Sequence, residues 1–300
     1  MPRRPIAQIL VIVLAVLVST SATADPIDDA VAAVGRGDYP AALRTFRALA
    51  DQDNTTAQYN LGMMYARGLG VAQDYAEATK WVGIAAEKGL AAAQNDYANM
   101  YRVGRGVARN EAEAVNWYRR AADQDFLPAQ TNLGHMYALG YGVPQNIGEA
   151  LKWYRQAAEQ DSPFAQNIVG IAYEHGISVE QSYEDALEWY RRAANKASDL
   201  SDLRLTHGPQ YNLAEMYASG RGVPKDNVQA YMWFTLAMRF GDVKSPDPLG
   251  AAMFGASKET AMERRDAIAK LLTREQIAES ERLARDWAPR LLLTIRPPAK

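Results

Sequence analysis

The sequence has 300 residues, of which 48% are hydrophobic and 23% are charged, and its formal net charge is −2. These values indicate a folded chain with a sizeable core, and they exclude a disordered polymer or a protein buried wholly in a membrane. No basic surplus is present to neutralise phosphates, so nucleic acid is not an expected partner. Cysteine is absent, which excludes disulfides, thiolate metal sites and a cysteine nucleophile.

Residues 1–24 have the pattern of a secretory signal peptide. Arg3 and Arg4 supply positive charge, residues 9–18 form an apolar run, and a stretch of small residues ends at Ala24. A membrane-spanning helix needs roughly 20 apolar residues, about twice the length of this run. We therefore expect cleavage near Ala24 and a periplasmic or secreted chain; the alternative is an uncleaved N-terminal anchor.

Residues 57–240 contain five similar segments, each with the pattern of a helix hairpin. They start at Asn60, Asp96, Asn132, Ile168 and Asn212, so three steps are 36 residues long and the last is 44. Tryptophan marks one position of the repeat, at Trp81, Trp117, Trp153, Trp189 and Trp233. Such self-similarity is typical of stacked helical arrays. We predict that the recurring indole is buried between successive hairpins, where it would remove ~150–250 Å² from water.

The G-x-G segment of each copy raises the question of a phosphate-binding loop. In residues 134–154 the apolar residues before Gly140 have helical spacing, and Pro144 prevents the helix from continuing. Gly140 suits the left-handed residue that ends a helix, and Asn146 with Glu149 has the spacing of a capping box. Similar boxes occur at Asp74–Glu77, Asn110–Glu113, Ser182–Asp185 and Asp226–Gln229. Because a phosphate loop is expected after a β-strand, we predict helix–helix turns here.

The ends of the array differ from its centre. Residues 25–56 have the pattern of a partial repeat that caps the N-terminal end, and residues 241–256 are a linker rich in proline and glycine. Residues 257–300 are predicted to form a helical cap and a tail, with helices at about 257–271 and 274–287. The sequence does not explain the insert at residues 195–208.

The repeated pattern resembles the Sel-1-like repeat family, a relative of tetratricopeptide repeat proteins. The third copy matches the family pattern at Ala129, Leu133, Gly134, Tyr137, Gly140, Gly142, Val143, Ala150, Trp153, Ala157 and Ala158. The fourth copy departs from it, because Ser178 replaces the second glycine of the turn. The resemblance implies an all-α fold, namely an α-solenoid of about five repeats with the partial repeat and the C-terminal cap at its ends.

The family resemblance also implies adaptor work, since its members generally bind other proteins and organise complexes. Exported bacterial members include regulators of membrane sensor kinases and factors in envelope biogenesis. One disulfide-rich branch is associated with β-lactam binding, but this chain lacks its cysteines. We expect a non-catalytic scaffold in the bacterial cell envelope, acting on a membrane or periplasmic partner whose identity the sequence does not give. A peptidoglycan-fragment or glycan binder is the alternative, and a hydrolase is a third reading.

By the same resemblance, the first helix of each hairpin lines the concave side of the array. The residues predicted to contact a partner are Tyr59, Met63, Asn95, Asn99, Arg102, Thr131, His135, Asn167, Ile171, Glu174, Tyr211 and Glu215. This mixed amide and aromatic surface suits an extended peptide or an amphipathic helix. The alternatives are a groove without a dedicated ligand and a partner on the convex face.

Catalytic and metal-binding motifs give no candidate site. His135 and His175 lie on first helices of adjacent copies, but neither helix has a second ligand at metal-binding spacing. The chain has no G-x-S-x-G elbow, and its acidic residues do not single out a catalytic pair. No catalytic residue, metal or cofactor is therefore expected, and the oligomeric state stays open.

Overall fold

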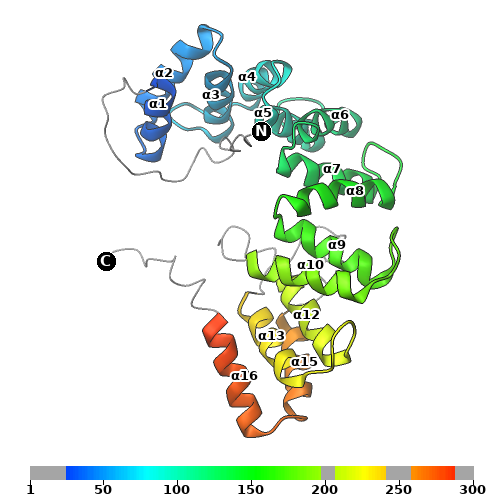
Figure 1. Ribbon diagram of the computed structural model, residues 1–300. Coiled ribbons are helices and arrows are strands. Elements are labelled where there is room, and N and C mark those ends of the chain that lie inside the picture. The colour runs from blue at the N-terminus through cyan, green and yellow to red at the C-terminus, as the bar shows by residue number, and fades with distance from the viewer. Residues whose placement is uncertain (1–24, 197–206, 241–257, 288–300) are drawn as a thin grey trace, which may run out of the picture. The chain divides into compact units, whose positions relative to one another are not determined.

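The computed structural model describes residues 25–196, 207–240 and 258–287. The predicted signal peptide, the linker at 241–256, most of the insert and the C-terminal tail lie outside these residues. Within the described ranges all regular elements are helices and none is a strand (Figure 1), so the all-α prediction is confirmed. No described helix has the length and apolar character needed to cross a membrane.

The helices follow one another as hairpins. The partial repeat is α1 (Pro26–Gly35) with α2 (Tyr39–Asp51), and the first full hairpin is α3 (Thr55–Arg67) with α4 (Tyr75–Glu87). The next hairpins are α5 (Ala91–Val103) with α6 (Glu111–Ala122), α7 (Leu127–Leu139) with α8 (Ile147–Glu159), α9 (Pro163–His175) with α10 (Tyr183–Lys196), and α12 (His207–Ser219) with α13 (Asn227–Phe240). The C-terminal helices are α15 (Lys258–Ala269) and α16 (Arg274–Trp287).

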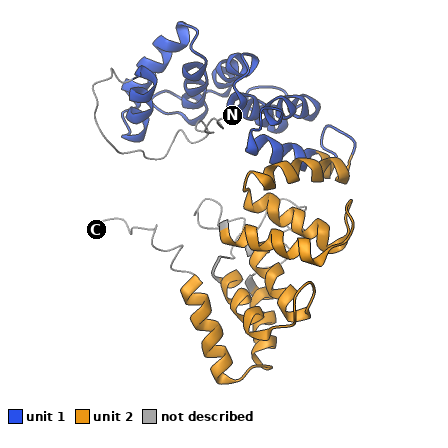
Figure 2. Cartoon of the chain, viewed as in Figure 1, with its two compact units in different colours: residues 1–136, 140–144 blue, residues 137–139, 145–300 orange. Residues whose placement is uncertain are grey.

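The chain divides into two compact units (Figure 2). Unit 1 consists of residues 1–136 and 140–144, and unit 2 consists of residues 137–139 and 145–300. In unit 1 the second helix of one hairpin packs on the first helix of the next, as α2 does on α3 and α4 does on α5. In unit 2 α8 packs on α9 and α10 packs on α12, and α13 contacts both α15 and α16. Each unit therefore has the stacked-hairpin packing that the repeats predict.

The turns within the hairpins confirm the glycine prediction. Gly140 ends α7 in the left-handed region with φ 73°, and Gly142 follows with φ 68°. A Cβ on Gly142 would lie 2.3 Å from the backbone carbon of Glu111, so the turn lies close against the start of α6. Ser178 keeps the same left-handed backbone with φ 58°, which costs more for a residue with a side chain than for glycine.

In the hairpins only one of the two hydrogen bonds of each capping box forms, as the third copy shows. The side chain of Asn146 accepts a hydrogen bond from the Glu149 N–H at 3.0 Å, as predicted. The backbone N–H of Asn146, however, donates to the carbonyl of Tyr137 at 2.9 Å. Equivalent backbone bonds join Asp74 to Tyr65, Asn110 to Tyr101, Ser182 to Tyr173 and Asp226 to Tyr217. In a capping box the side chain three residues after the N-cap accepts a hydrogen bond from the N-cap N–H. Here a tyrosine carbonyl of the first helix accepts that hydrogen bond instead.

The prediction that the tryptophans are buried holds for two of the five, since Trp117 and Trp233 are 9% and 8% exposed, and it is wrong for the other three. Trp81, Trp153 and Trp189 are only partly buried. The fully buried side chain is the one that follows each tryptophan, namely Val82, Tyr118, Tyr154, Tyr190 and Phe234, with Phe46 in the partial repeat. Consecutive helical residues point about 100° apart, so the indoles of Trp81, Trp153 and Trp189 lie at the edge of the core. The Arg120 and Arg192 guanidinium carbons lie 4.4 Å from the ring centroids of Trp117 and Trp189 respectively.

Candidate functional site

Side-chain hydrogen bonds join the first helices α3 to α5, α5 to α7 and α9 to α12, and we call this set of bonds the polar spine. Its bonds, donor first, are Tyr59 Oη to Asp96 Oδ2 at 2.8 Å, Asn132 Nδ2 to Asn95 Oδ1 at 2.9 Å and Asn212 Nδ2 to Asn167 Oδ1 at 3.0 Å. Burial raises the pKa of the Asp96 carboxyl, opposed by the hydrogen bond from Tyr59. Asn95 and Asn167 are 7% and 0% exposed. Three residues predicted to contact a partner, Tyr59, Asn95 and Asn167, therefore link neighbouring repeats.

Asn99 and Arg102 meet at a core tyrosine. Tyr118 donates its hydroxyl hydrogen to Asn99 Oδ1 at 2.7 Å, and Arg102 Nε donates to Tyr118 Oη at 3.3 Å. Burial raises the pKa of Tyr118. Asn99 and Arg102 thus have an internal partner, although Arg102 remains exposed.

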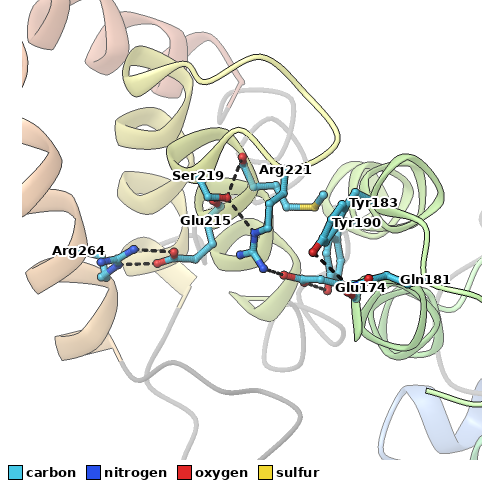
Figure 3. A network of polar contacts seen from close by, with 9 residues as sticks. Glu174, Gln181, Tyr183, Tyr190, Glu215, Ser219, Arg221 and Arg264 are labelled. Atoms are coloured by element: carbon cyan, nitrogen blue, oxygen red, sulfur yellow. Dashed lines mark hydrogen bonds and ion pairs between the residues drawn. The ribbon is translucent and has the colours of Figure 1, made fainter. Parts of the chain in front are cut away.

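In the last repeat the predicted contact residues face the C-terminal cap. Arg264 of α15 makes two hydrogen bonds of 2.6 Å to the two carboxylate oxygens of Glu215, and Figure 3 shows the paired geometry. Burial, followed by the charge of Glu215, raises the pKa of Tyr211 to about 12. The chain's own cap therefore occupies the place that a partner was expected to take at Glu215.

Glu174 lies in a closed polar cluster, which we call the ion-pair gap (Figure 3). Its side chain is 8% exposed and contacts Arg221 Nη1 at 2.6 Å. Tyr190 donates its hydroxyl hydrogen to Glu174 Oε2 at 2.6 Å, and burial, with the Glu174 charge second, raises the tyrosine pKa well above its ordinary value. Arg221 Nε also donates to Ser219 Oγ at 2.9 Å. The carboxylate is paired with Arg221 and almost inaccessible to solvent, so the cluster suits a structural role.

Two largely apolar hollows lie between helices of neighbouring hairpins, one in each unit. The first notch, of about 330 Å³, is lined by Val31, Val34, Phe46, Asn60, Met63, Met64, Arg67 and Leu69. The second notch, of about 360 Å³, is lined by Ala138, Ile147, Ala150, Leu151, Tyr154, Ile168, Ile171, Ala172 and Ile177. These volumes include space open to solvent, and the enclosed cavity is about 40 Å³ in the first notch and about 50 Å³ in the second. Each notch can therefore take part of one side chain and not a whole small molecule.

The two notches occupy the same position of the repeat. Phe46, Met63 and Leu69 in the first notch are each 108 residues, or three periods of 36, before Tyr154, Ile171 and Ile177 in the second. Sequence reasoning selected Met63 and Ile171 but missed the hollows. A signal was present, because Met63 and Leu69 in the first copy and Ile171 and Ile177 in the fourth are all aliphatic or methionine. The other copies pair Asn99 with Arg105, His135 with Tyr141 and Glu215 with Arg221.

The remaining predicted residues give no further site. Thr131 donates its hydroxyl to the Leu127 carbonyl of its own helix at 3.2 Å, and His135 is half-buried. His175 is exposed at the end of α9. Among the described residues, no three His, Asp or Glu side chains are grouped so that they could hold a metal ion. The notches are therefore the surface with the clearest capacity to receive a ligand.

Comparison with known proteins gives the same repeats. The family model described as Sel1 repeat matches residues 55–90, 91–126, 127–162, 163–198 and 210–239. The structure is similar to that of a Sel1 repeat protein from Oxalobacter formigenes, with 28% sequence identity and a TM-score of 0.66, covering 82% of this chain and 100% of that one.

A second similar structure is that of a protective antigen present in uropathogenic Escherichia coli strains, displaying an SLR fold. It has 23% sequence identity and a TM-score of 0.50, covers 88% of this chain and 76% of that one, and shows the fold alone. No curated protein matches the sequence. Since the five family matches together span more than half of the residues, the chain belongs to the Sel1 repeat family.

Proposed function

We propose that this protein is a non-catalytic adaptor of the bacterial cell envelope that binds a segment of a membrane or periplasmic partner protein through its apolar notches. Sel1 repeat proteins generally mediate protein–protein interaction, and the fold is typically an interaction module without catalysis. The observation that carries the proposal is the pair of apolar notches at one position of the repeat. The N-terminal pattern of charge, apolar run and small residues supports export.

The second notch shows why a protein segment is the favoured ligand. Its lining has no charged side chain, and its rim residues Ile147 and Ile177 are 38% and 41% exposed. An aliphatic side chain inserted there would contribute about 0.8 kcal/mol for each CH₂ group that it buries, which makes it an anchor and leaves specificity to the rest of the segment. A peptide can place such a side chain in the notch while its backbone runs along the neighbouring helices.

The binding proposal is tested by selecting random linear peptides on the purified chain. We expect selected peptides to lose at least about tenfold in affinity, ~1.4 kcal/mol, when a charge is placed in the notch they use, by Ile177→Glu or Met63→Glu. Leu271→Glu is the matched control, because Leu271 is 61% exposed and lines neither notch. Peptides that bind all of these variants equally would refute the notches as the binding surface.

Export is tested separately by fractionating cells that produce the chain with a C-terminal tag. We expect the tagged protein in the periplasm or the medium, with Asp25 as its first residue. A chain that keeps residues 1–24 and stays in the membrane fraction would favour the N-terminal anchor and contradict a released adaptor.

The glycan-binding alternative has less support than it had from the sequence. It is motivated by the export signal and by the Asn, Thr and Tyr side chains among the predicted contact residues, but the polar spine uses Tyr59, Asn95 and Asn167 for contacts between repeats. The notches have apolar walls, whereas a sugar needs convergent hydrogen-bonding groups. Titration calorimetry with muropeptides should therefore give no heat of binding.

A further inference from the structure

The first notch differs from the second by one charge at its rim. Arg67 lines the first notch and is exposed at the end of α3. No charged side chain lines the second notch. The apolar walls of the first notch come from α1, α2 and α3, with Val31, Val34 and Met63 among them. A ligand of the first notch therefore meets a hydrophobic floor and a cation together.

The guanidinium of Arg67 is available to a ligand. Across the described ranges, neither a hydrogen bond nor an ion pair joins its side chain to another residue. Asp96 is near enough for the Arg67 charge to lower its pKa, but burial has the larger, opposite effect. The Asp96 carboxylate already accepts hydrogen bonds from Tyr59 at 2.8 Å and from Asn95 at 3.1 Å. A helix C-terminus also favours a basic residue, so the charge needs a test that separates binding from helix stability.

We propose that the first notch binds a partner segment in which a large aliphatic or methionine side chain has an aspartate or glutamate one or two positions away. The apolar side chain enters between α1 and α3, and the carboxylate pairs with Arg67. This inference rests on the proposed function and adds the chemistry of the partner at one of its two notches. Guanidinium is well suited to carboxylate because its donors can form two parallel hydrogen bonds.

The test uses random linear peptides selected on the purified chain and sorted by the notch they need. Peptides that bind the wild type but no longer bind the Met63→Glu variant should be enriched in acidic residues beside a large apolar residue. Peptides that no longer bind the Ile177→Glu variant should show no such enrichment, since no charged side chain lines the second notch. An equal acidic content in both sets would overturn the inference and leave the proposed function standing.

A charge reversal at Arg67 gives a more specific test of the inference. Arg67→Glu should weaken the acidic peptides at least about tenfold, whereas Arg44→Glu makes the same charge change at an exposed position of α2 outside the notch and should have less than about a twofold effect. Exchanging the acidic residue of the peptide for lysine should restore binding to Arg67→Glu, which a loss of helix stability alone would not allow. Equal effects of the two arginine variants, or no restoration, would overturn the inference. If no peptide is selected by either notch, the proposed function fails with it.

Discussion

The second notch and the ion-pair gap are two versions of one place in the repeat, and both lie in unit 2. Ala138 and Tyr154 of the notch are each 36 residues before Glu174 and Tyr190 of the gap. Ile177 is at the turn position that Arg221 occupies in the next copy. In one copy the two variable positions leave a hollow with aliphatic walls. In the other they form a closed ion pair on the same hairpin backbone.

This difference shows which residues set the fold and which set the chemistry. Glycines and caps fix the hairpin, while the side chains between repeats decide whether the space is filled or open. A buried ion pair adds little net stability, because desolvation offsets the attraction between its charges. Aliphatic residues at a rim, such as Ile147 and Ile177, leave apolar surface in water unless something covers them. The closed gap supports the stack, and the open notch is the better candidate for a partner.

The largest effect on stability is expected from removing the cation of the Glu174–Arg221 ion pair. Arg221→Ala leaves the buried Glu174 carboxylate without its cation and should lower the free energy of unfolding by about 3 kcal/mol, the lower end of the range for buried pairs, since Arg221 is 34% exposed. Urea denaturation measures this change. The double variant Glu174→Ala with Arg221→Ile, which copies the notch, should recover most of it. A double variant as unstable as the single one would show that the charge is not the cause.

A slightly smaller effect is expected from moving the pair into the second notch. Ala138 is 1% exposed, so Ala138→Glu alone should cost about 2–3 kcal/mol by burying an unpaired charge. Adding Ile177→Arg supplies the cation and should restore stability to within about 1 kcal/mol of the wild type. The restored protein should no longer bind the peptides that need the second notch. Retained peptide binding would place the binding surface elsewhere.

The sequence was sufficient for the hairpins because their signals are local. The left-handed glycines, the prolines and the N-cap side chains act within a few residues. The sequence pattern predicts helices at about 57–67 and 75–88, and the structure has α3 at Thr55–Arg67 and α4 at Tyr75–Glu87. Period alone could not decide between Trp153 and Tyr154, because both recur and only packing shows which one points inward. The tyrosine is 1% exposed and the indole is not fully buried.

The site was harder to predict for a different reason. The positions of the polar spine look unrepeated, which suggested that they were free for a partner. Their pairs are complementary, Tyr59 with Asp96 and Asn95 with Asn132, so the interaction recurs although the residue types change. The notches are spaces left by several helices, and a single-sequence pattern marks their walls without showing that they are empty.

A smaller effect is expected from Tyr190→Phe within the ion-pair gap. The variant removes the 2.6 Å hydrogen bond from the tyrosine to Glu174 and should lower the free energy of unfolding by about 1–1.5 kcal/mol. The same substitution in the Glu174→Ala, Arg221→Ile background removes no bond to Glu174 and should cost less. Equal losses in the two backgrounds, measured by urea denaturation, would mean that the hydroxyl acts independently of the carboxylate.

The smallest effect concerns pH and compares Tyr211, beside the Glu215–Arg264 pair, with the second notch. Burial, with Glu215 second, raises the pKa of Tyr211 to about 12, compared with about 10 in an unfolded chain. The folded protein then holds this proton at pH values where the unfolded chain loses it, so stability falls as pH rises from about 10 to about 12. Tyr211→Phe should make this alkaline loss less steep and leave the profile parallel to the wild type below about pH 9. Because the second notch has no charged lining, Ile171→Val there should shift the whole profile without changing its slope; identical slopes for the wild type and Tyr211→Phe would contradict the coupling to Tyr211.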